Sequence, residues 1–163
     1  MADIRIRKRK RLRNKEVKAL SDELSSMLGV QIDFGDEPVD RAESPDFDLI
    51  FVGNDILGLI KDEKPFLTIR GVLRYKPVLR SVTVDMGAVP YLTNGADCMG
   101  PGITDADENI AEGDFVWIKD VKNNVPLAIG ITLRSGADLK KKQSGKAIKT
   151  LTNVGDKLWK AGE

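Results

Sequence analysis

The hydrophobic positions in the first half of the chain change their period along the sequence. Between Asn14 and Leu28 the apolar side chains recur at three- and four-residue intervals, which is typical of an amphipathic helix, and Gly29 follows as its expected stop. Two short apolar runs, Phe47–Val52 and Ile56–Ile60, flank a Gly-Asn-Asp turn and predict a β-hairpin. Together these elements indicate a small α+β unit.

Four further segments of this half have a less regular pattern. Residues 1–13 mix isoleucines with cations and predict a strand or an arm. Val30–Phe34 is expected to begin a strand, whereas the acidic, turn-rich stretch Gly35–Pro45 predicts an exposed loop. Phe66–Val72 is another apolar stretch rich in strand-forming residues, so we expect a strand there.

The second half alternates short apolar stretches with glycines. Val82 and Val84 alternate with polar residues as in a strand, and Gly87–Asn94 predicts a short helix that ends at Gly95. Ser135 is expected to cap a lysine-rich turn, and further strands are predicted at 115–118, 125–133, 146–152 and 157–159. Short strands with glycine turns predict a closed or nearly closed barrel. We expect two units, residues 1–78 and 79–160.

The composition narrows the chemistry that is available. The 163 residues include 41% hydrophobic residues, no histidine and one cysteine, Cys98. An internal disulfide, a cysteine-based zinc site and histidine-dependent catalysis are therefore excluded. No phosphate loop or dinucleotide fingerprint is visible either, so we expect no catalytic residue, metal or cofactor. Without an apolar run of about 20 residues or a secretory signal, the chain is expected to be cytoplasmic, with no membrane partner.

Charge is unevenly distributed although the formal net charge is only +1. Residues 1–20 contain nine Lys or Arg and two acidic residues, while residues 31–64 contain ten acidic residues and three basic ones. The acidic stretch lacks the spacing of a calcium loop and predicts a solvated loop or a surface for a basic protein. For the basic arm, the alternatives are contact with RNA or the ribosome, a nuclear address and a charged strand edge. Its members are Arg5, Arg7, Lys8, Arg9, Lys10, Arg11 and Arg13.

Glycines are densest in the segment NGADCMGPG at residues 94–102. A backbone without Cβ atoms can adopt positive φ angles and approach a phosphate or ribose closely; the alternative is that these glycines only turn a tight barrel. Tyr91 is the candidate for stacking on a base, whereas Trp117 and Trp159 are expected in the core. Cys98 is expected to be a small buried or loop-lining residue. Because no histidine is present to lower its pKa, we do not expect it to act as a nucleophile.

Five segments in this order resemble the PUA domain, a compact RNA-binding pseudobarrel. They are VDMGAVPYLTNGADCMGPGI from Val84, GDFVWI from Gly113, LAIG from Leu127, SGKAI from Ser144 and GDKLW ending at Trp159. The resemblance implies an α+β fold in which a PUA β-pseudobarrel follows the N-terminal unit and the terminal Leu-Trp pair closes the barrel. It also implies RNA contact by the helix and the glycine loop, through Tyr91, Asn94, Gly95, Ala96, Gly100 and Gly102. The SGKAI segment adds Gly145 and Lys146, and upstream of it lie Lys140, Lys141 and Lys142, which attract phosphates or form a solvated helix face.

The segment from Phe66 to Ile103 is similar to the translation-associated PUA proteins, which include the malignant T-cell-amplified sequence protein, the N-terminal part of ligatin and archaeal single-chain counterparts. The likeness is carried by Pro65, Thr68 and Arg70, then by Tyr-Lys-Pro and Asp-Met-Gly-Ala. It implies a non-enzymatic protein that binds tRNA or small-subunit rRNA in translation initiation or recycling, with an initiation-factor-like protein as partner. An accessory module for tRNA or rRNA modification and a protein–protein adaptor are the alternatives.

Overall fold

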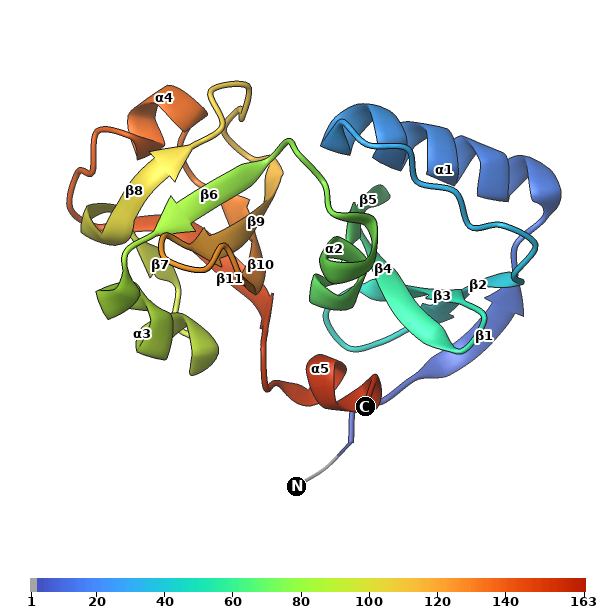
Figure 1. Cartoon of the computed structure of the whole chain (residues 1–163). Helices are drawn as coiled ribbons and strands as arrows, with labels where there is room; N and C mark the ends of the chain where they lie inside the picture. The colour runs from blue at the N-terminus through green and yellow to red at the C-terminus, as the bar shows by residue number, and fades with distance from the viewer. Residues whose placement is uncertain (1–2) are drawn as a thin grey trace.

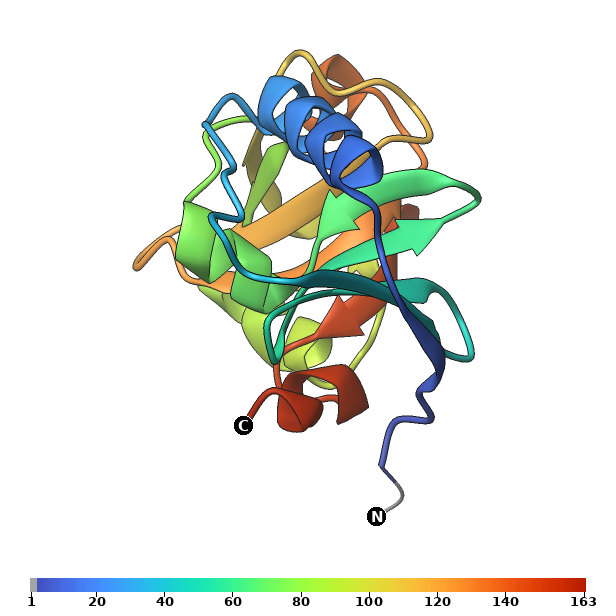
Figure 2. The same ribbon diagram turned by 90° about the vertical axis from the view of Figure 1, so that its right-hand side faces the viewer.

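Two β-sheet units lie side by side in the computed structural model, which describes residues 3–163 (Figure 1). The first unit contains an antiparallel five-stranded meander in the order β1-β2-β3-β4-β5. Its strands are β1 (Arg7–Arg11), β2 (Val39–Glu43), β3 (Asp48–Val52), β4 (Asp55–Lys61) and β5 (Lys64–Leu67). Two helices pack on this sheet, α1 (Asn14–Leu28) and α2 (Ile69–Tyr75). In Figures 1 and 2 α1 lies above the strands.

Helix α1 has the predicted bounds because its sequence specifies both ends. Leu20, Leu24 and Leu28 are the buried positions of its apolar face. The Glu16 carboxylate accepts a hydrogen bond from the backbone N–H of Arg13 at 3.0 Å, which satisfies one donor at the N-terminus. Gly29 adopts a left-handed conformation with φ 68° and ends the helix.

The second unit is a six-stranded sheet in the order β7-β11-β10-β9-β6-β8. Its strands are β6 (Ser81–Val84), β7 (Cys98–Met99), β8 (Ile103–Ala106), β9 (Phe115–Asp120), β10 (Pro126–Thr132) and β11 (Lys146–Asn153). The edge strands β7 and β8 are separated along the chain only by the 3₁₀ turn η2 (Gly100–Gly102), so the sheet curls back toward itself. This arrangement is the predicted, nearly closed barrel. The short helices η1 (Met86–Ala88), α3 (Val89–Thr93) and α4 (Gly136–Leu139) lie between its strands along the chain. The last helix, α5 (Lys157–Ala161), follows β11 and contacts α2 of the first unit.

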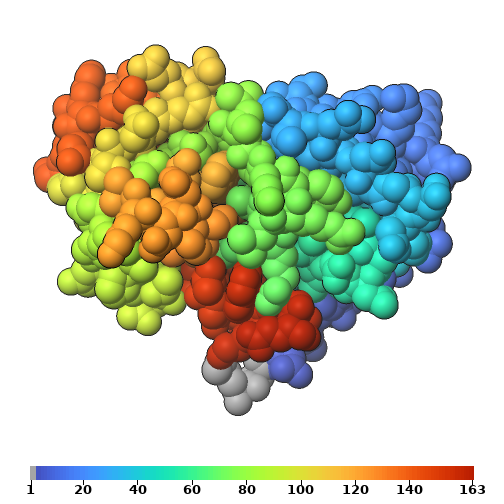
Figure 3. Space-filling model, in the orientation of Figure 1, coloured from blue at the N-terminus to red at the C-terminus, as the bar shows by residue number. Residues whose placement is uncertain are grey.

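The two units share one hydrophobic cluster. The rings of Phe66 in β5 and Phe115 in β9 stack with their centroids 5.4 Å apart. Trp117 belongs to the same cluster, and its Nε1 donates a hydrogen bond to the Leu79 carbonyl at 2.8 Å. The space-filling view shows the C-terminal segment, coloured red, lying between the units (Figure 3). The expected division at residue 78 falls in the connection from α2 to β6, and we propose it as the boundary of two units that pack as one body.

Four sequence-based expectations were wrong. The stretch Gly35–Pro45 contains strand β2, because Val39, Asp40 and Ala42 are buried between β1 and β3. The strand expected over Phe66–Val72 ends at Leu67, since the Thr68 hydroxyl accepts from the Gly71 N–H and starts α2. Val30–Phe34 forms no strand.

The fourth concerns residues 157–159, which form helix α5 rather than a strand. The Asp156 carboxylate accepts from the Trp159 N–H at 2.9 Å and caps the helix. Trp159 consequently packs against the first unit and does not close the barrel, whereas Trp117 lies in the core as expected.

The N-terminal arm forms strand β1 from Arg7 onward, as one of its alternatives anticipated. Residues 1 and 2 of the predicted arm lie outside the described residues. Across residues 3–163, no helix combines the length and apolar content needed to span a membrane.

Candidate nucleic-acid interface

Helix α3 and the glycine loop lie together on one surface of the barrel. Contacts at both ends of the helix hold it there. The Asp85 carboxylate accepts from the Ala88 N–H at 3.0 Å before the helix begins. Gly95, with φ 88°, ends the helix. From β11, the Asn153 side-chain amide donates to the Thr93 carbonyl at 3.0 Å. The last contact ties the end of α3 to the sheet, and sequence reasoning missed it because Asn153 lies far along the chain.

Large side chains point outward from this surface. The inward residue Leu92 is buried, whereas Tyr91 is 69% exposed and Met99 of β7 is 51% exposed. Gly102 of η2 approaches Ala88 closely enough that a Cβ atom on it would lie 3.2 Å from the alanine Cβ, so the loop abuts η1. Exposed aromatic and apolar groups of this kind offer faces on which bases stack.

The backbone of the loop is less available than the sequence suggested. The amide N–H groups of Asn94, Gly95 and Ala96 donate to carbonyls of α3 at 3.0–3.2 Å. They cannot also cradle a phosphate. What these three exposed residues present is the Asn94 side chain and a small-residue contour.

Gly100 is needed for close packing against the neighbouring segment, not for the close approach of a ligand. It is buried, and a Cβ atom placed on it would lie 1.8 Å from the Gln143 carbonyl oxygen. Its N–H donates to the Gly145 carbonyl at 2.9 Å, which joins the glycine loop to the residues before β11. Arg134, which sequence reasoning missed, donates to the carbonyls of Gln143 and Ser144 at 2.9 and 2.8 Å and holds that segment in place.

The predicted lysines are exposed, but most of them have acidic neighbours. Lys146 Nζ lies 2.9 Å from the Asp97 carboxylate, and this hydrogen bond is the main cause that lowers the pKa of Asp97. Lys140 pairs with Glu108 at 2.8 Å and Lys141 with Asp138 at 3.0 Å. Lys142 has no ion pair within residues 3–163. The positive charge of this surface is therefore smaller than a count of lysines implies.

Cys98 does not supply a nucleophile. The side chain is buried in the barrel core, and burial raises the pKa of the thiol to about 12. A thiol with such a pKa stays protonated at neutral pH and reacts slowly. In the described part of the chain, no cluster of three or more His, Cys, Asp or Glu side chains is arranged to hold a metal.

The basic arm does not belong to this surface. Arg7–Arg11 form β1 at the free edge of the first sheet, and Arg13 precedes α1. Figure 1 shows α5 between β1 and α3. The structure thus separates the predicted site residues into two groups, one on each unit.

Comparison with known proteins identifies the class of fold. The PUA-domain family model matches residues 80–152. The uncharacterized protein MJ1432 of Methanocaldococcus jannaschii is 41% identical over 160 residues, covering 94% of this chain and 96% of that protein. The crystal structure of the hypothetical protein PH0734.1 from Pyrococcus horikoshii superposes with a TM-score of 0.81 at 34% identity, covering 96% of this chain and all of that one.

The chain belongs to the PUA-domain family. Within it, the chain is also 31% identical over 117 residues to translation machinery-associated protein 20 of Eremothecium gossypii, covering 68% of this chain and 65% of that relative. The PUA domain and this translation-associated relative support an RNA-binding role.

Proposed function

We propose that this chain binds a structured RNA, tRNA or small-subunit rRNA, during translation. The contact surface comprises α3, the glycine loop and the start of β11. Its members are Tyr91, Asn94, Gly95, Ala96, Gly102, Gly145 and Lys146, with Lys140, Lys141 and Lys142 beside them. Gly100 supports this surface from below, because it is buried.

The observation that carries the proposal is the exposure of Tyr91. A tyrosine with 69% of its surface in water, on a short helix whose next residue is fully buried, is presented outward by a rigid support. The nearby Asn94 side chain makes no hydrogen bond within the described residues, so its amide is available to a base edge or a ribose. Lysines at the rim add phosphate attraction that salt weakens.

The test compares the variant Tyr91→Ala with wild type in binding to purified tRNA and to small ribosomal subunits. Loss of one base–aromatic stack costs about 1–3 kcal/mol, so we expect the affinity for the cognate RNA to fall by roughly 5- to 150-fold. Val125→Ala, which truncates another exposed apolar side chain in the β9–β10 turn, serves as the matched control and should bind as wild type does.

Equal affinities for wild type and Tyr91→Ala would refute the assignment of this surface. If wild type bound neither tRNA nor subunits more tightly than an unstructured RNA, the translation function itself would be wrong. Selective binding to substrates of tRNA modification would favour the accessory role. The initiation-factor-like partner stays a prediction.

A further inference from the structure

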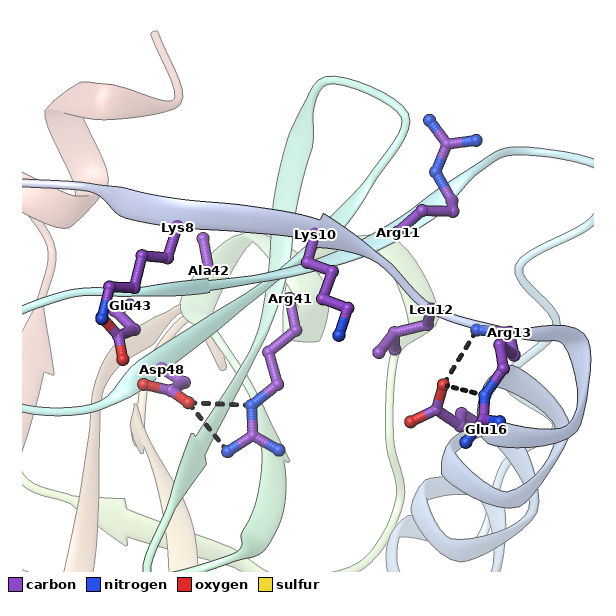
Figure 4. Close-up of a pocket in the computed structure, with 10 residues that line it drawn as sticks. All are labelled: Lys8, Lys10, Arg11, Leu12, Arg13, Glu16, Arg41, Ala42, Glu43 and Asp48. Atoms are coloured by element: carbon purple, nitrogen blue, oxygen red, sulfur yellow. Dashed lines mark hydrogen bonds and ion pairs between the residues drawn. The ribbon is translucent and has the colours of Figure 1, made fainter.

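A hollow with basic walls runs along the free edge of the first sheet, on the opposite unit from the proposed RNA surface (Figure 4). It has a volume of about 620 Å³ and lies between β1, the start of α1 and strands β2 and β3. Lys8 and Lys10 point into it from β1, and Arg41 reaches it from β2. An adjoining hollow is lined by Arg5 and Arg7 and shares Glu43 and Asp48 with the first. We call the two together the β1 groove.

A β-bulge collects these cations on one face. Arg7 is paired with Glu43 and Lys10 with Arg41, so three steps along β1 correspond to two steps along β2. In a regular strand Arg7 and Lys10, which are three residues apart, would point to opposite faces, because side chains alternate along a strand. The bulge brings both to the face that carries Arg41 and Glu43. Lys8, within the bulge, has a left-handed φ of 53° that a non-glycine residue seldom adopts.

The other arginines of β1 have a structural role on the opposite face. Arg9 Nε and Arg11 Nε donate to the two carboxylate oxygens of Asp40 at 2.7 and 2.5 Å, and Asp40 is only 7% exposed. Burial opposes ionisation of Asp40, but the hydrogen bonds from these arginines outweigh it, so the pKa is lowered. Arg9 also lies 3.9 Å from the centre of the Phe51 ring.

Three of the cations that line the β1 groove have no acidic partner, unlike Arg9 and Arg11. Arg5, Arg7 and Lys10 make no ion pair with any residue from 3 to 163. Lys10 also lies directly opposite Arg41 in the register, so its neighbour across the strand pair is another cation and not a carboxylate.

Three carboxylates face the same groove, and each already has a cationic partner. Asp48 holds Arg41 at 2.8 Å, and Glu63 from outside the groove also pairs with Arg41 at 3.0 Å. Glu16 holds Arg13 at 3.2 Å. Glu43 is 3.8 Å from Lys8, with both side chains exposed. The charge that remains is positive, because Arg5, Arg7 and Lys10 have no acidic partner among residues 3–163.

We propose that the β1 groove is a second phosphate-binding surface, which holds the backbone of the RNA bound by the PUA unit without reading its sequence. This inference rests on the proposed function. Exposed lysines and arginines without acidic partners complement a polyanion, and such contacts release counterions from the RNA. The structure thus divides the basic arm: Arg9 and Arg11 hold the sheet, whereas Arg5, Arg7 and Lys10 contact phosphates.

The test measures how the affinity for an unmodified tRNA transcript depends on KCl concentration, by fluorescence anisotropy. The groove variant is Arg7→Gln, Lys10→Gln, which removes two exposed charges that support no ion pair in the described structure. The control is Lys64→Gln, Lys122→Gln, which removes two exposed charges outside the groove. We expect the slope of log K against log[salt] to become shallower by roughly 1–2 in the groove variant, at about 0.7–0.9 for each lost phosphate contact, and to be unchanged in the control.

Identical slopes for the groove variant and the control would overturn the proposal. Unchanged RNA slopes combined with weaker binding of poly-glutamate would assign the groove to an acidic protein and overturn it equally. Tyr91→Ala distinguishes the two sites, because loss of stacking lowers affinity without changing the salt slope. If only the groove variant had an effect, the RNA surface on the barrel would be wrong, and of the two assignments only the phosphate contact of the groove would stand.

Discussion

At the residue scale, glycines of the same loop are required for different reasons. Gly95 has φ 88°, a conformation that costs an L-residue strain. Gly100 has an ordinary backbone conformation, but the Gln143 carbonyl occupies the place where its Cβ atom would be. Sequence spacing shows the cluster of glycines, and only the packing shows which requirement applies to each.

The substitution Gly100→Ala tests this difference. Because the added methyl group would force the Gln143 carbonyl away, we expect the free energy of unfolding to fall by about 1–3 kcal/mol. Gly87→Ala is the control, since its Cβ would meet only the Asp85 side chain at 3.4 Å. That variant should remain within about 1 kcal/mol of wild type. Urea denaturation of both proteins is the measurement, and equal midpoints would show that the 143–145 segment yields freely.

At the scale of elements, α5 connects the two units. The five-residue helix is too short to be stable alone, so its position depends on tertiary contacts. Arg70 of α2 provides them: its Nη2 donates to the Trp159 carbonyl at 2.7 Å, and its guanidinium lies 3.9 Å from the centre of the Trp159 ring. The terminal Leu-Trp segment, which the sequence predicted to close the barrel, therefore attaches the second unit to α2 of the first unit.

We predict that Arg70→Ala weakens the attachment of α5 to α2. Loss of a charged hydrogen bond and a cation–π contact should lower the free energy of unfolding by about 1–3 kcal/mol and speed amide exchange in α5. Arg74→Ala, which removes an exposed pair with Asp55 from the same helix, should cost less than about 1 kcal/mol. Hydrogen exchange followed by mass spectrometry measures both. Unchanged protection of α5 in Arg70→Ala would show that Trp159 packing alone positions it.

At the scale of the whole molecule, the two sheets do not have separate cores at their junction. Phe66, Phe115, Trp117 and Ile129 belong to one buried cluster drawn from both units. A body of this kind should unfold cooperatively, although its halves have different topologies. The orientation of the β1 groove relative to the α3 surface is consequently fixed by a hydrophobic junction.

Phe66→Ala tests this coupling from the side of the first unit. Removing a fully buried aromatic ring typically costs about 3–5 kcal/mol, and we expect the free energy of unfolding to fall by about that amount. If the units are coupled, the urea midpoint reported by tryptophan fluorescence, which arises from Trp117 of β9 and from Trp159 at the junction with the first unit, should fall as far as the midpoint reported by far-UV circular dichroism. A fluorescence midpoint that stayed at the wild-type value would mean that the barrel unfolds independently.

The sequence by itself determined the elements whose signals are local. Helix α1, its glycine stop and the β3–β4 hairpin follow from side-chain period and turn residues, and their predicted positions agree with the structure to within one or two residues. Short strands and glycine turns likewise predicted a nearly closed barrel. The resemblance of five ordered segments to the PUA domain identified which barrel it is, and the family model matches residues 80–152.

Tertiary structure alone decided which charges remain available. Asp40 is paired with Arg11, 29 residues away, and Asp97 accepts from Thr150, 53 residues away, while it also neutralises Lys146. Strand β2 forms because β1 and β3 pair with its two edges, although its own sequence is acidic. Such pairings depend on register, and a single bulged residue in β1 changes which cations share a face. The sequence shows which charged residues are present. The strand register in the folded protein determines which of them are left without a partner and can bind a ligand.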